Sequence, residues 1–391
     1  IDLEPNVIDE AKNGPLKTIL NFEYLLCGKE DAANNFARGY YTIGRQMIDK
    51  VSDSLRKLTD NCDHIMGFLI AHSIGGGTGS GLGALILEQL QKYYKRVPKI
   101  GFEIYPSPIV STCVVEPYNV LLGNHWLLDY TNITFVLENA ALYDICQKKL
   151  HIVKPDINNL NRLVAKMFSW MAQSCRLYQY TSIDLDEMQA KLVPFPQIHF
   201  MTTGMGPIVS KADVITAPNT VEDITDECFK PSNWFVQCTD FDPIKDKYMA
   251  ILTQYRGNVT SKQAHLAHSW ARQNGKCSLI EWCPTGFRYE LDDTPVTILE
   301  ADDMGPCDKT AFIIANNTSI SRMFAKRIAQ KFDYLYSQQA FVHWYLGEGM
   351  EQEQFLNARG DLGMLVRDYA DILSEEPTDD LSEKDEDGDY W

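Results

Sequence analysis

The segment Ser73-Ile-Gly-Gly-Gly-Thr-Gly-Ser-Gly81 constrains the fold of this chain more than any other. It follows an apolar run at residues 65–71, which predicts a buried parallel strand. It precedes residues 80–95, where apolar side chains recur at helical spacing. Glycine has no Cβ, so backbone N–H groups at a helix N-terminus can approach an anion closely. The segment therefore predicts a phosphate-binding loop, with a plain flexible turn as the alternative.

The loop does not match the two commonest nucleotide-binding motifs. No Lys-Ser/Thr pair closes it, as a Walker A motif requires, and the GxGxxG spacing of dinucleotide folds is missing. The chain also lacks GxSxG and HExxH, so the sequence offers no hydrolase elbow and no zinc-protease helix.

Composition and charge limit the classes of function. A length of 391 residues suggests two or three domains, and a net charge of −17 makes nucleic acid an unfavourable partner. The sequence contains no run of eighteen apolar residues, so it does not predict a membrane-spanning helix. The ten cysteines form no CxxC, which favours a reduced, cytoplasmic protein without a disulfide framework.

The last residues, 374–391, form an acidic tail. Nine carboxylates and one lysine give this segment a charge of −8, and it has very few apolar side chains. Such a segment cannot bury enough surface to fold, so a solvated, disordered tail is expected. It either solubilises the chain or attracts basic partners.

Strands and helices alternate over residues 1–138. Helices are predicted at 39–57, 80–95 and 117–128, and strands at 65–71, 99–105 and 133–137. This alternation predicts an α/β fold with a mostly parallel, doubly wound sheet. A ligand is expected at the carboxyl ends of its strands, where the glycine loop lies.

The remaining chain predicts two further units. Residues 139–317 contain a helix at 158–176, strands of a second sheet at 193–203 and 246–256, and long loops at 206–220 and 288–310. Residues 318–373 read as two helices, at 318–333 with an Asn317 or Thr318 cap and at 349–373.

Several motifs together resemble the tubulin family. They are Gly75–Gly81, Asp31-Ala-Ala-Asn-Asn35, Val115-Glu-Pro-Tyr-Asn119, Trp282-Cys-Pro-Thr-Gly-Phe287 and Phe341-Val-His-Trp-Tyr345. The resemblance runs from residue 1 to the acidic tail. It implies a Rossmann-like GTP-binding domain (1–138), a core helix and α+β intermediate domain (139–317), C-terminal helices (318–373) and the tail. It also implies a GTPase that forms a heterodimer and assembles into cytoplasmic microtubules.

Three segments resemble alpha rather than beta subunits. These are Ser182-Ile-Asp-Leu-Asp-Glu-Met-Gln189, the long loop between Phe287 and Asn316, and residues 341–350. The alpha resemblance implies that the chain's own GTP is retained at the interface with beta-tubulin. It also implies that Glu187, with Asp184 beside it, completes the GTPase site of the next beta subunit.

The residues around Glu187 allow two interpretations of this side chain. A carboxylate at a loop-to-helix junction can orient or deprotonate a water molecule. Alternatively, Asp184 and Glu187 form a capping box, with Asp at the N-cap and Glu three residues later. The residue pattern alone favours the capping box. The resemblance to alpha subunits favours the catalytic role instead.

The resemblance also implies the residues of the nucleotide site. The phosphates would contact Gly76, Gly77, Thr78 and Gly79, with Ser73, Ala32 and Asn34 nearby. The ribose would lie beside Thr112 and Glu116, and Asn139 and Asn161 would read the guanine edge. Mg²⁺ would be held through Asp2, Glu4 and Asp31, since this ion prefers oxygen ligands.

The chain departs from the family pattern in three places. Ile157 stands where the family usually has a tyrosine that stacks on guanine, which could cost on the order of 1–3 kcal/mol of binding. The tail ends Tyr390-Trp391 after aspartates, which puts tyrosine removal and glutamylation in doubt. The family's first strand and helix precede residue 1, so the 391-residue chain alone is expected neither to fold stably nor to retain GTP.

Two functions remain open at this stage. The first is a polymerising, alpha-tubulin-like subunit whose partners are beta-tubulin, neighbouring protofilaments and basic microtubule-associated proteins and motors. The second is a specialised relative with a structural role only. The residues from Asp213 to Asn219, in the loop where protofilaments would meet, look unusual for the family and favour the second.

Overall fold

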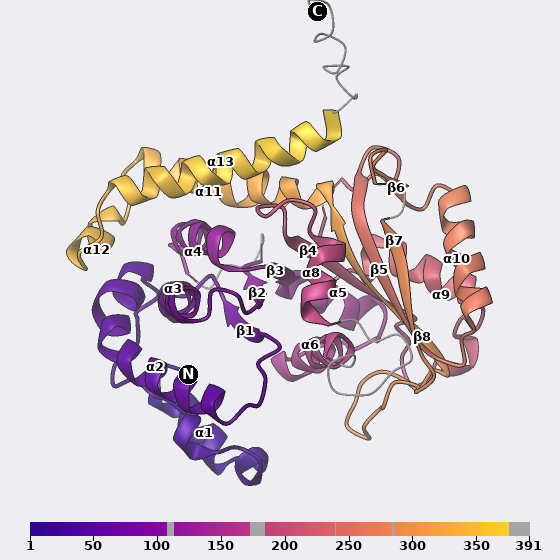
Figure 1. Cartoon of the computed structure of the whole chain (residues 1–391), viewed down its shortest axis with the longest axis horizontal. Coiled ribbons are helices and arrows are strands. Elements are labelled where there is room, and N and C mark those ends of the chain that lie inside the picture. The colour runs from indigo at the N-terminus through magenta and orange to yellow at the C-terminus, as the bar shows by residue number, and fades with distance from the viewer. Residues whose placement is uncertain (108–112, 173–183, 239, 284–285, 375–391) are drawn as a thin grey trace, which may run out of the picture.

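The computed structural model describes residues 1–107, 113–172, 184–238, 240–283 and 286–374. Its strands form one sheet in the order β1-β2-β3-β4-β8-β5-β6, with β7 paired to β5 (Figure 1). Their bounds are β1 (Phe68–Ser73), β2 (Lys99–Tyr105), β3 (Ile133–Glu138), β4 (Phe200–Gly206), β5 (Lys247–Gly257), β6 (Ser278–Leu279), β7 (Phe287–Asp292) and β8 (Lys309–Asn317).

Strand direction divides this sheet into two parts. Strands β1 to β4 are parallel to one another, whereas β8 is antiparallel to both β4 and β5. Only Thr134↔Phe200 and Phe135↔Met201 pair β3 with β4. The prediction of a second, separate sheet is therefore wrong, because β4 belongs to both parts and joins them.

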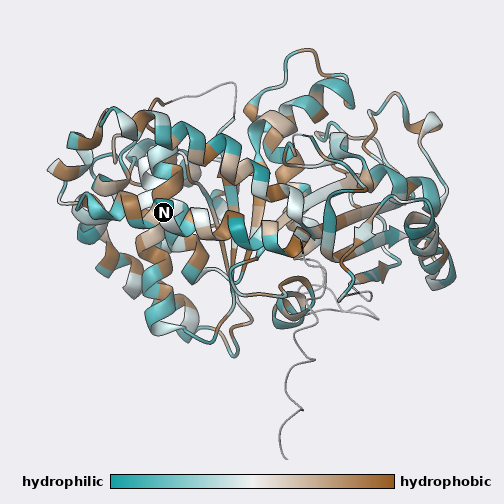
Figure 2. Ribbon diagram, turned by 90° about the horizontal axis from the view of Figure 1, so that it is seen from above, coloured by the Kyte–Doolittle hydropathy of each residue, from teal (hydrophilic) through white to brown (hydrophobic). Residues whose placement is uncertain are grey.

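The helices lie on both sides of the sheet and along one end of it (Figure 1). Their bounds are α1 (Pro5–Asn13), α2 (Ile43–Asp60), α3 (Gly83–Tyr93), α4 (Glu116–Tyr130), α5 (Asn139–Lys148), α6 (Ile157–Met171), α8 (Leu185–Leu192), α9 (Val221–Phe229), α10 (Ser261–Gln273), α11 (Gln330–Ser337), α12 (Val342–Gly347) and α13 (Glu353–Ser374). Hydrophilic and hydrophobic residues are interleaved along these helices (Figure 2), as expected where one face packs and the other meets water.

Most sequence-predicted elements of the first part are present. The strand at 99–105 is confirmed, and the strand predicted at 65–71 forms three residues later. The prediction of a loop over all of 288–310 is wrong, because β7 pairs along β5 from Ile251↔Phe287 onward. Helices α9 and α10 were not predicted; both begin at a threonine cap, Thr220 and Thr260, which is the signal that could have found them.

The segment predicted as one helix at 318–333 is also broken into parts. A 3₁₀ turn (Thr318–Ile320) and a π-helical stretch (Met323–Ala329) precede α11. The predicted Asn317 cap is confirmed, because its side chain accepts a hydrogen bond from the Ser319 N–H. The final helix starts at Glu353 rather than 349 and buries the predicted apolar face: Phe355, Leu362, Leu365, Tyr369 and Ile372.

Strand β1 is the outermost strand on one side of the sheet in the described part of the chain. Its residues alternate between half-buried and exposed, whereas nearly all of β2 and β3 is buried. Leu69 and Ala71 lie on the exposed side. The other side carries Ile70 and His72 and faces helices.

Tyr118 of α4 connects the parallel sheet domain to the C-terminal helices. It is fully buried, and its ring makes edge contacts with Phe332, Tyr345 and Phe355. Its hydroxyl donates to the carbonyl of Ala340 at 2.8 Å. These contacts explain why α11 and α13 lie across α4 in Figure 1.

Replacing Tyr118 should separate the contribution of its hydroxyl hydrogen bond from that of its ring packing. Tyr118→Phe removes only the hydrogen bond and should cost about 1 kcal/mol of unfolding free energy. Tyr118→Ala also leaves a cavity and should cost about 3–5 kcal/mol. Urea denaturation followed by fluorescence measures both, with the exposed Tyr334→Ala as the control that changes stability by less than about 0.5 kcal/mol. Equal unfolding free energies for Tyr118→Phe, Tyr118→Ala and Tyr334→Ala would contradict the role of Tyr118 in joining α4 to the C-terminal helices.

Candidate nucleotide-binding site

The glycine loop lies at the carboxyl end of β1 and leads into α3. Three of its glycines are needed because other parts of the protein approach them closely. A Cβ at Gly79 would lie 1.9 Å from the Ser73 carbonyl oxygen, and one at Gly81 would lie 2.3 Å from that of Phe36. A Cβ at Gly77 would lie 2.5 Å from the Asn35 nitrogen. The loop is thus packed against its neighbours on one side.

Gly76 differs from these three glycines. A Cβ there would meet nothing closer than Asn34 Oδ1, at 3.6 Å. Protein packing therefore does not require glycine at this position, and its φ is not in the left-handed region. The backbone at Gly76 therefore has no neighbour closer than van der Waals contact on this side, which is what an anion would need to reach it.

The segment 31–35 forms the facing wall of this space. Asp31 Oδ1 accepts a hydrogen bond from the Ala32 N–H at 2.7 Å, which holds the start of the turn. Ala33 and Asn34 have φ angles of 50° and 53°, in the left-handed region that only tight turns normally use. The turn brings Ala32 and Asn34 next to the glycine loop: Ala32 Cβ would lie 2.9 Å from a Cβ at Gly77.

Asn119 of α4 joins the two loops, and the sequence analysis did not single it out as a site residue. It is fully buried, and its Nδ2 donates to the carbonyls of Asn34 at 2.7 Å and Gly75 at 3.0 Å. Its Oδ1 accepts from the Phe36 N–H at 3.0 Å and the Tyr345 hydroxyl at 2.8 Å. An asparagine within a mostly apolar helix was the available signal.

Glu116 and Ser73 also lie at this edge. Glu116, the first residue of α4, is nearly buried, and its Oε1 accepts from the Cys113 N–H at 3.2 Å. Its side chain passes within 3.7 Å of where a Cβ of Gly75 would be. Ser73 ends β1, and its hydroxyl donates to the Ile104 carbonyl at 3.4 Å. Thr78 begins the π-helical turn that follows the loop. Thr112 lies outside the described residues.

The predicted guanine-reading residues lie farther along the same edge. Asn139 is the first residue of α5, directly after β3, so two strand spacings of about 4.8 Å each separate it from the end of β1. Asn161 and Ile157 lie in the first turns of α6, which packs against α5. In the described part of the chain the amides of Asn139 and Asn161 make no hydrogen bond. Ile157 is 67% exposed and covers nothing.

Asp2 and Glu4 are held near the 28–31 turn. The backbone of Asp2 bonds to Leu26 and Gly28, and Asp2 Oδ1 accepts from the Glu4 N–H at 3.1 Å. Among the described residues, no three His, Cys, Asp or Glu side chains form a closed metal cluster. A magnesium ion bound by one or two carboxylates and by phosphate oxygens does not need such a cluster.

Glu187 lies near the amino ends of the parallel strands, whereas the glycine loop lies at their carboxyl ends. Leu185, the first residue of α8, reaches Gly67, which directly precedes β1: a Cβ at Gly67 would lie 2.6 Å from Leu185 Cδ1. Since β1 has six residues of about 3.3 Å each, roughly 20 Å of strand separates this point from the glycine loop. Glu187 is therefore not part of the site around this chain's own loop.

The local contacts of Glu187 weigh against the capping-box alternative. Asp184 occupies the N-cap position of α8 but makes no side-chain cap hydrogen bond. Glu187 instead pairs with Lys191, one turn along the helix, with 2.5 Å between Oε1 and Nζ. Half of the Glu187 side chain remains exposed. The carboxylate is accessible to a neighbouring molecule.

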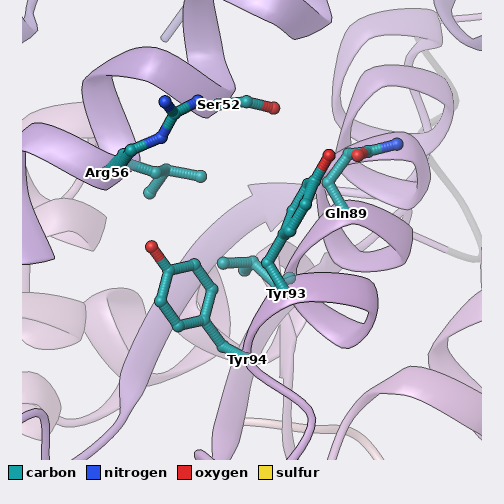
Figure 3. A pocket seen from close by; sticks show the side chains of 7 residues that line it. Ser52, Arg56, Gln89, Tyr93 and Tyr94 are labelled. Carbon is teal, nitrogen blue, oxygen red and sulfur yellow. The ribbon is translucent and has the colours of Figure 1, made fainter.

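A cavity of about 260 Å³ lies between α2 and α3, but it is not this site (Figure 3). Arg56 lines it from α2 and Tyr93 and Tyr94 from the carboxyl end of α3. The eleven residues of α3, at about 1.5 Å each, place it roughly 16 Å from the glycine loop.

Comparisons with known proteins agree with the geometry. Residues 1–147 match "Tubulin/FtsZ family, GTPase domain", and residues 196–329 match "Tubulin C-terminal domain". The chain is 45% identical over 372 residues to the tubulin alpha-1 chain of Saccharomyces cerevisiae, covering 95% of this chain and 82% of that protein. It is 44% identical over 386 residues to the tubulin alpha-3 chain of Zea mays, covering 99% and 85%. No described helix is long and apolar enough to cross a membrane.

Two glycine substitutions should separate packing from binding. Gly76→Ala would place its Cβ at ordinary contact distance from Asn34 Oδ1, so we expect native unfolding temperature but loss of bound nucleotide, measured by chromatography of the acid-released bases. Gly79→Ala would place its Cβ against the Ser73 carbonyl, so we expect misfolding or strong destabilisation. Retention of nucleotide by a folded Gly76→Ala protein would contradict the site.

Proposed function

The chain belongs to the tubulin family as an alpha-tubulin homologue, and on that premise we propose that it is a microtubule subunit which holds GTP in its glycine loop and completes the GTPase site of a beta-tubulin neighbour. The observation that carries this proposal is the placement of Glu187. The nucleotide loop and this carboxylate lie at opposite edges of one sheet, so the carboxylate can serve only a nucleotide held by another molecule.

The residues at the carboxyl edge suit a nucleoside triphosphate. The backbone of Gly76, Gly77, Thr78 and Gly79 would bind its phosphates, with Ser73, Ala32 and Asn34 around them. Glu116, with Thr112, would lie beside the ribose. The unpaired amides of Asn139 and Asn161 offer the donors and acceptors that a guanine edge requires. Asp2, Glu4 and Asp31 would hold Mg²⁺ and its waters, and the ion would neutralise charge on the phosphates.

Hydrolysis needs a water molecule in line with the terminal phosphate and a group that orients it or removes its proton. We assign this role to Glu187, with Asp184 beside it, acting across the interface with the next beta subunit. Lys191 would hold the carboxylate in place until that interface forms. Because the water-activating group then belongs to a different subunit from the nucleotide, hydrolysis would be coupled to assembly. Glu187 itself lies too far from this chain's own nucleotide to act on it, so that nucleotide would be retained.

The two edges of the sheet both carry exposed aromatic side chains. Trp344, 63% exposed, lies at the carboxyl edge, where its carbonyl accepts from Asn35 Nδ2 at 3.1 Å. At the amino edge, Phe195 and Trp282 form an exposed edge-to-face pair with 5.7 Å between ring centroids. Two different apolar ends on one molecule suit a head-to-tail, heterologous contact, which generates filaments.

Lateral contacts and the acidic tail would complete the interactions in a microtubule. The loop after β4 presents Ile215, which is 96% exposed, in the region where neighbouring protofilaments would meet. The tail would attract basic microtubule-associated proteins and motors by its charge. With these partners the protein would lie in the cytoskeleton of the cytoplasm. The alternative, a specialised tubulin relative with a structural role only, would form the heterodimer without polymerising.

Glu187→Ala should uncouple assembly from hydrolysis. The variant should form heterodimers and polymer, while phosphate release in the polymer falls by about 10²- to 10⁴-fold, the usual effect of losing a general base. Asp186→Ala, an exposed carboxylate on the same helix, is the matched control and should hydrolyse normally. Unchanged phosphate release by the Glu187→Ala polymer would refute the catalytic role.

Ile157→Tyr should strengthen nucleotide binding by restoring an aromatic surface. Stacking of about 1–3 kcal/mol corresponds to roughly 5- to 150-fold slower release of labelled GTP from the heterodimer. Val153→Tyr, an exposed position in the connection before α6, should leave the release rate unchanged. Equal rates for the two variants would show that the base does not lie over residue 157.

A further inference from the structure

A buried ion pair lies directly beneath the glycine loop. His72 on β1 and Glu103 on β2 are register partners, so their side chains point to the same face of the sheet. The distance from His72 Nε2 to Glu103 Oε2 is 3.0 Å. The Glu103 side chain is fully buried and that of His72 is 11% exposed. The pair is enclosed between the sheet and α3.

The His72 ring contacts the elements that position the loop. It directly precedes Ser73, and a Cβ at Gly83 would lie 3.1 Å from its Nδ1. Burial by itself lowers the pKa of His72, but the Glu103 carboxylate and the Gly79 backbone outweigh it, so the pKa is raised above its ordinary value. The ring thus lies between Glu103 on β2 and Gly83 at the start of α3.

Glu103 depends on this partner. In the described part of the chain neither of its carboxylate oxygens makes a hydrogen bond. An unpaired carboxylate at such a site is strongly unfavourable, since water cannot solvate it. The surroundings offer no other cation among the described residues: Gly101 and Thr131 lie beside the carboxylate, and Tyr105 follows it on β2.

The nearby titratable groups do not replace His72. Burial raises the pKa of Tyr105, and Glu103 raises it further, so this hydroxyl stays neutral and donates to Asn124 Oδ1 at 2.7 Å. His199, which reaches Thr131 from the segment before β4, has its pKa lowered to about 4 by burial and stays neutral as well. On α3, Glu88 instead accepts from the Tyr40 hydroxyl at 2.6 Å.

We propose that the His72–Glu103 pair positions the glycine loop, and that the loop holds nucleotide tightly only while His72 is protonated. This inference rests on the proposed function, because it assumes that the loop binds GTP. His72 is a positioning residue and need not contact the nucleotide. Loss of its proton would leave Glu103 as an unpaired buried charge next to Ser73 and the start of α3, so the loop between them would loosen.

The sign of the pH effect follows from the direction of the shift. A group whose pKa is raised on folding contributes stability that is fully present below its unfolded value, about 6.5 for histidine. That contribution is lost as the pH rises through the folded value. Nucleotide retention should therefore weaken on the alkaline side.

The test uses the full chain in its heterodimer with beta-tubulin, loaded with radiolabelled GTP, with release followed between about pH 6 and pH 9. We expect release from this chain to accelerate by about tenfold or more as the pH rises. Glu103→Gln has the same shape without charge and should release GTP roughly 10- to 100-fold faster at low pH, with no alkaline step, as expected for loss of an interaction with a charged group. Glu103→Asp should restore the pH step in part.

His72→Gln should release GTP as fast as Glu103→Gln and likewise show no alkaline step. The double variant should release GTP no faster than either single variant, because the two residues act as one unit. His125→Gln is the matched control: His125 pairs with Asp361 at 2.6 Å between α4 and α13, away from the loop. It should keep the wild-type pH profile.

The possible outcomes separate the two proposals. If the wild-type chain carries no GTP, the proposed function fails. If it carries GTP but its release has no pH step, or if Glu103→Gln keeps that step, the positioning role of the pair is overturned. If His72→Gln does not fold, the isosteric Glu103→Gln variant still decides the matter.

Discussion

The parallel direction of β1 to β4 is the constraint on which this account depends. Parallel strands place all their carboxyl ends at one edge of a sheet and all their amino ends at the other. The glycine loop after β1 and Asn139 after β3 therefore share an edge. The helix that carries Glu187 starts beside Gly67, at the other edge. The proposed function requires this arrangement, with a nucleotide at one end of the strands and a carboxylate for a second nucleotide at the other.

The nucleotide edge is held by buried polar groups rather than by apolar packing alone. Asn119 uses both ends of its amide to fix the two loops and α12 relative to one another. Beneath the same loop, Glu103 is balanced by His72. Buried polar groups of this kind are costly unless every partner is in place, so they favour one loop geometry over all others. That geometry leaves room for a Cβ at Gly76.

Much of this edge could be predicted from the sequence, because its signals are local. Alternating strand and helix patterns predicted the parallel sheet, and they placed the glycine loop between a strand and a helix, where the structure has it. The roles of Asn119 and Glu103 could not be predicted, since each depends on residues brought together from distant parts of the chain. The joining of the sheet through β4 was missed for the same reason: two residue pairs between β3 and β4 leave no mark on the periodicity of either strand.

The most direct test of the central claim is a structure of this chain assembled with beta-tubulin in the presence of a slowly hydrolysed GTP analogue. The account predicts nucleotide at the glycine loop of every copy of this chain. It also predicts the Glu187 carboxylate within one water molecule of the terminal phosphate bound by the adjoining beta subunit. An empty glycine loop, or a Glu187 side chain that faces solvent and still pairs with Lys191 in the assembled polymer, would contradict it.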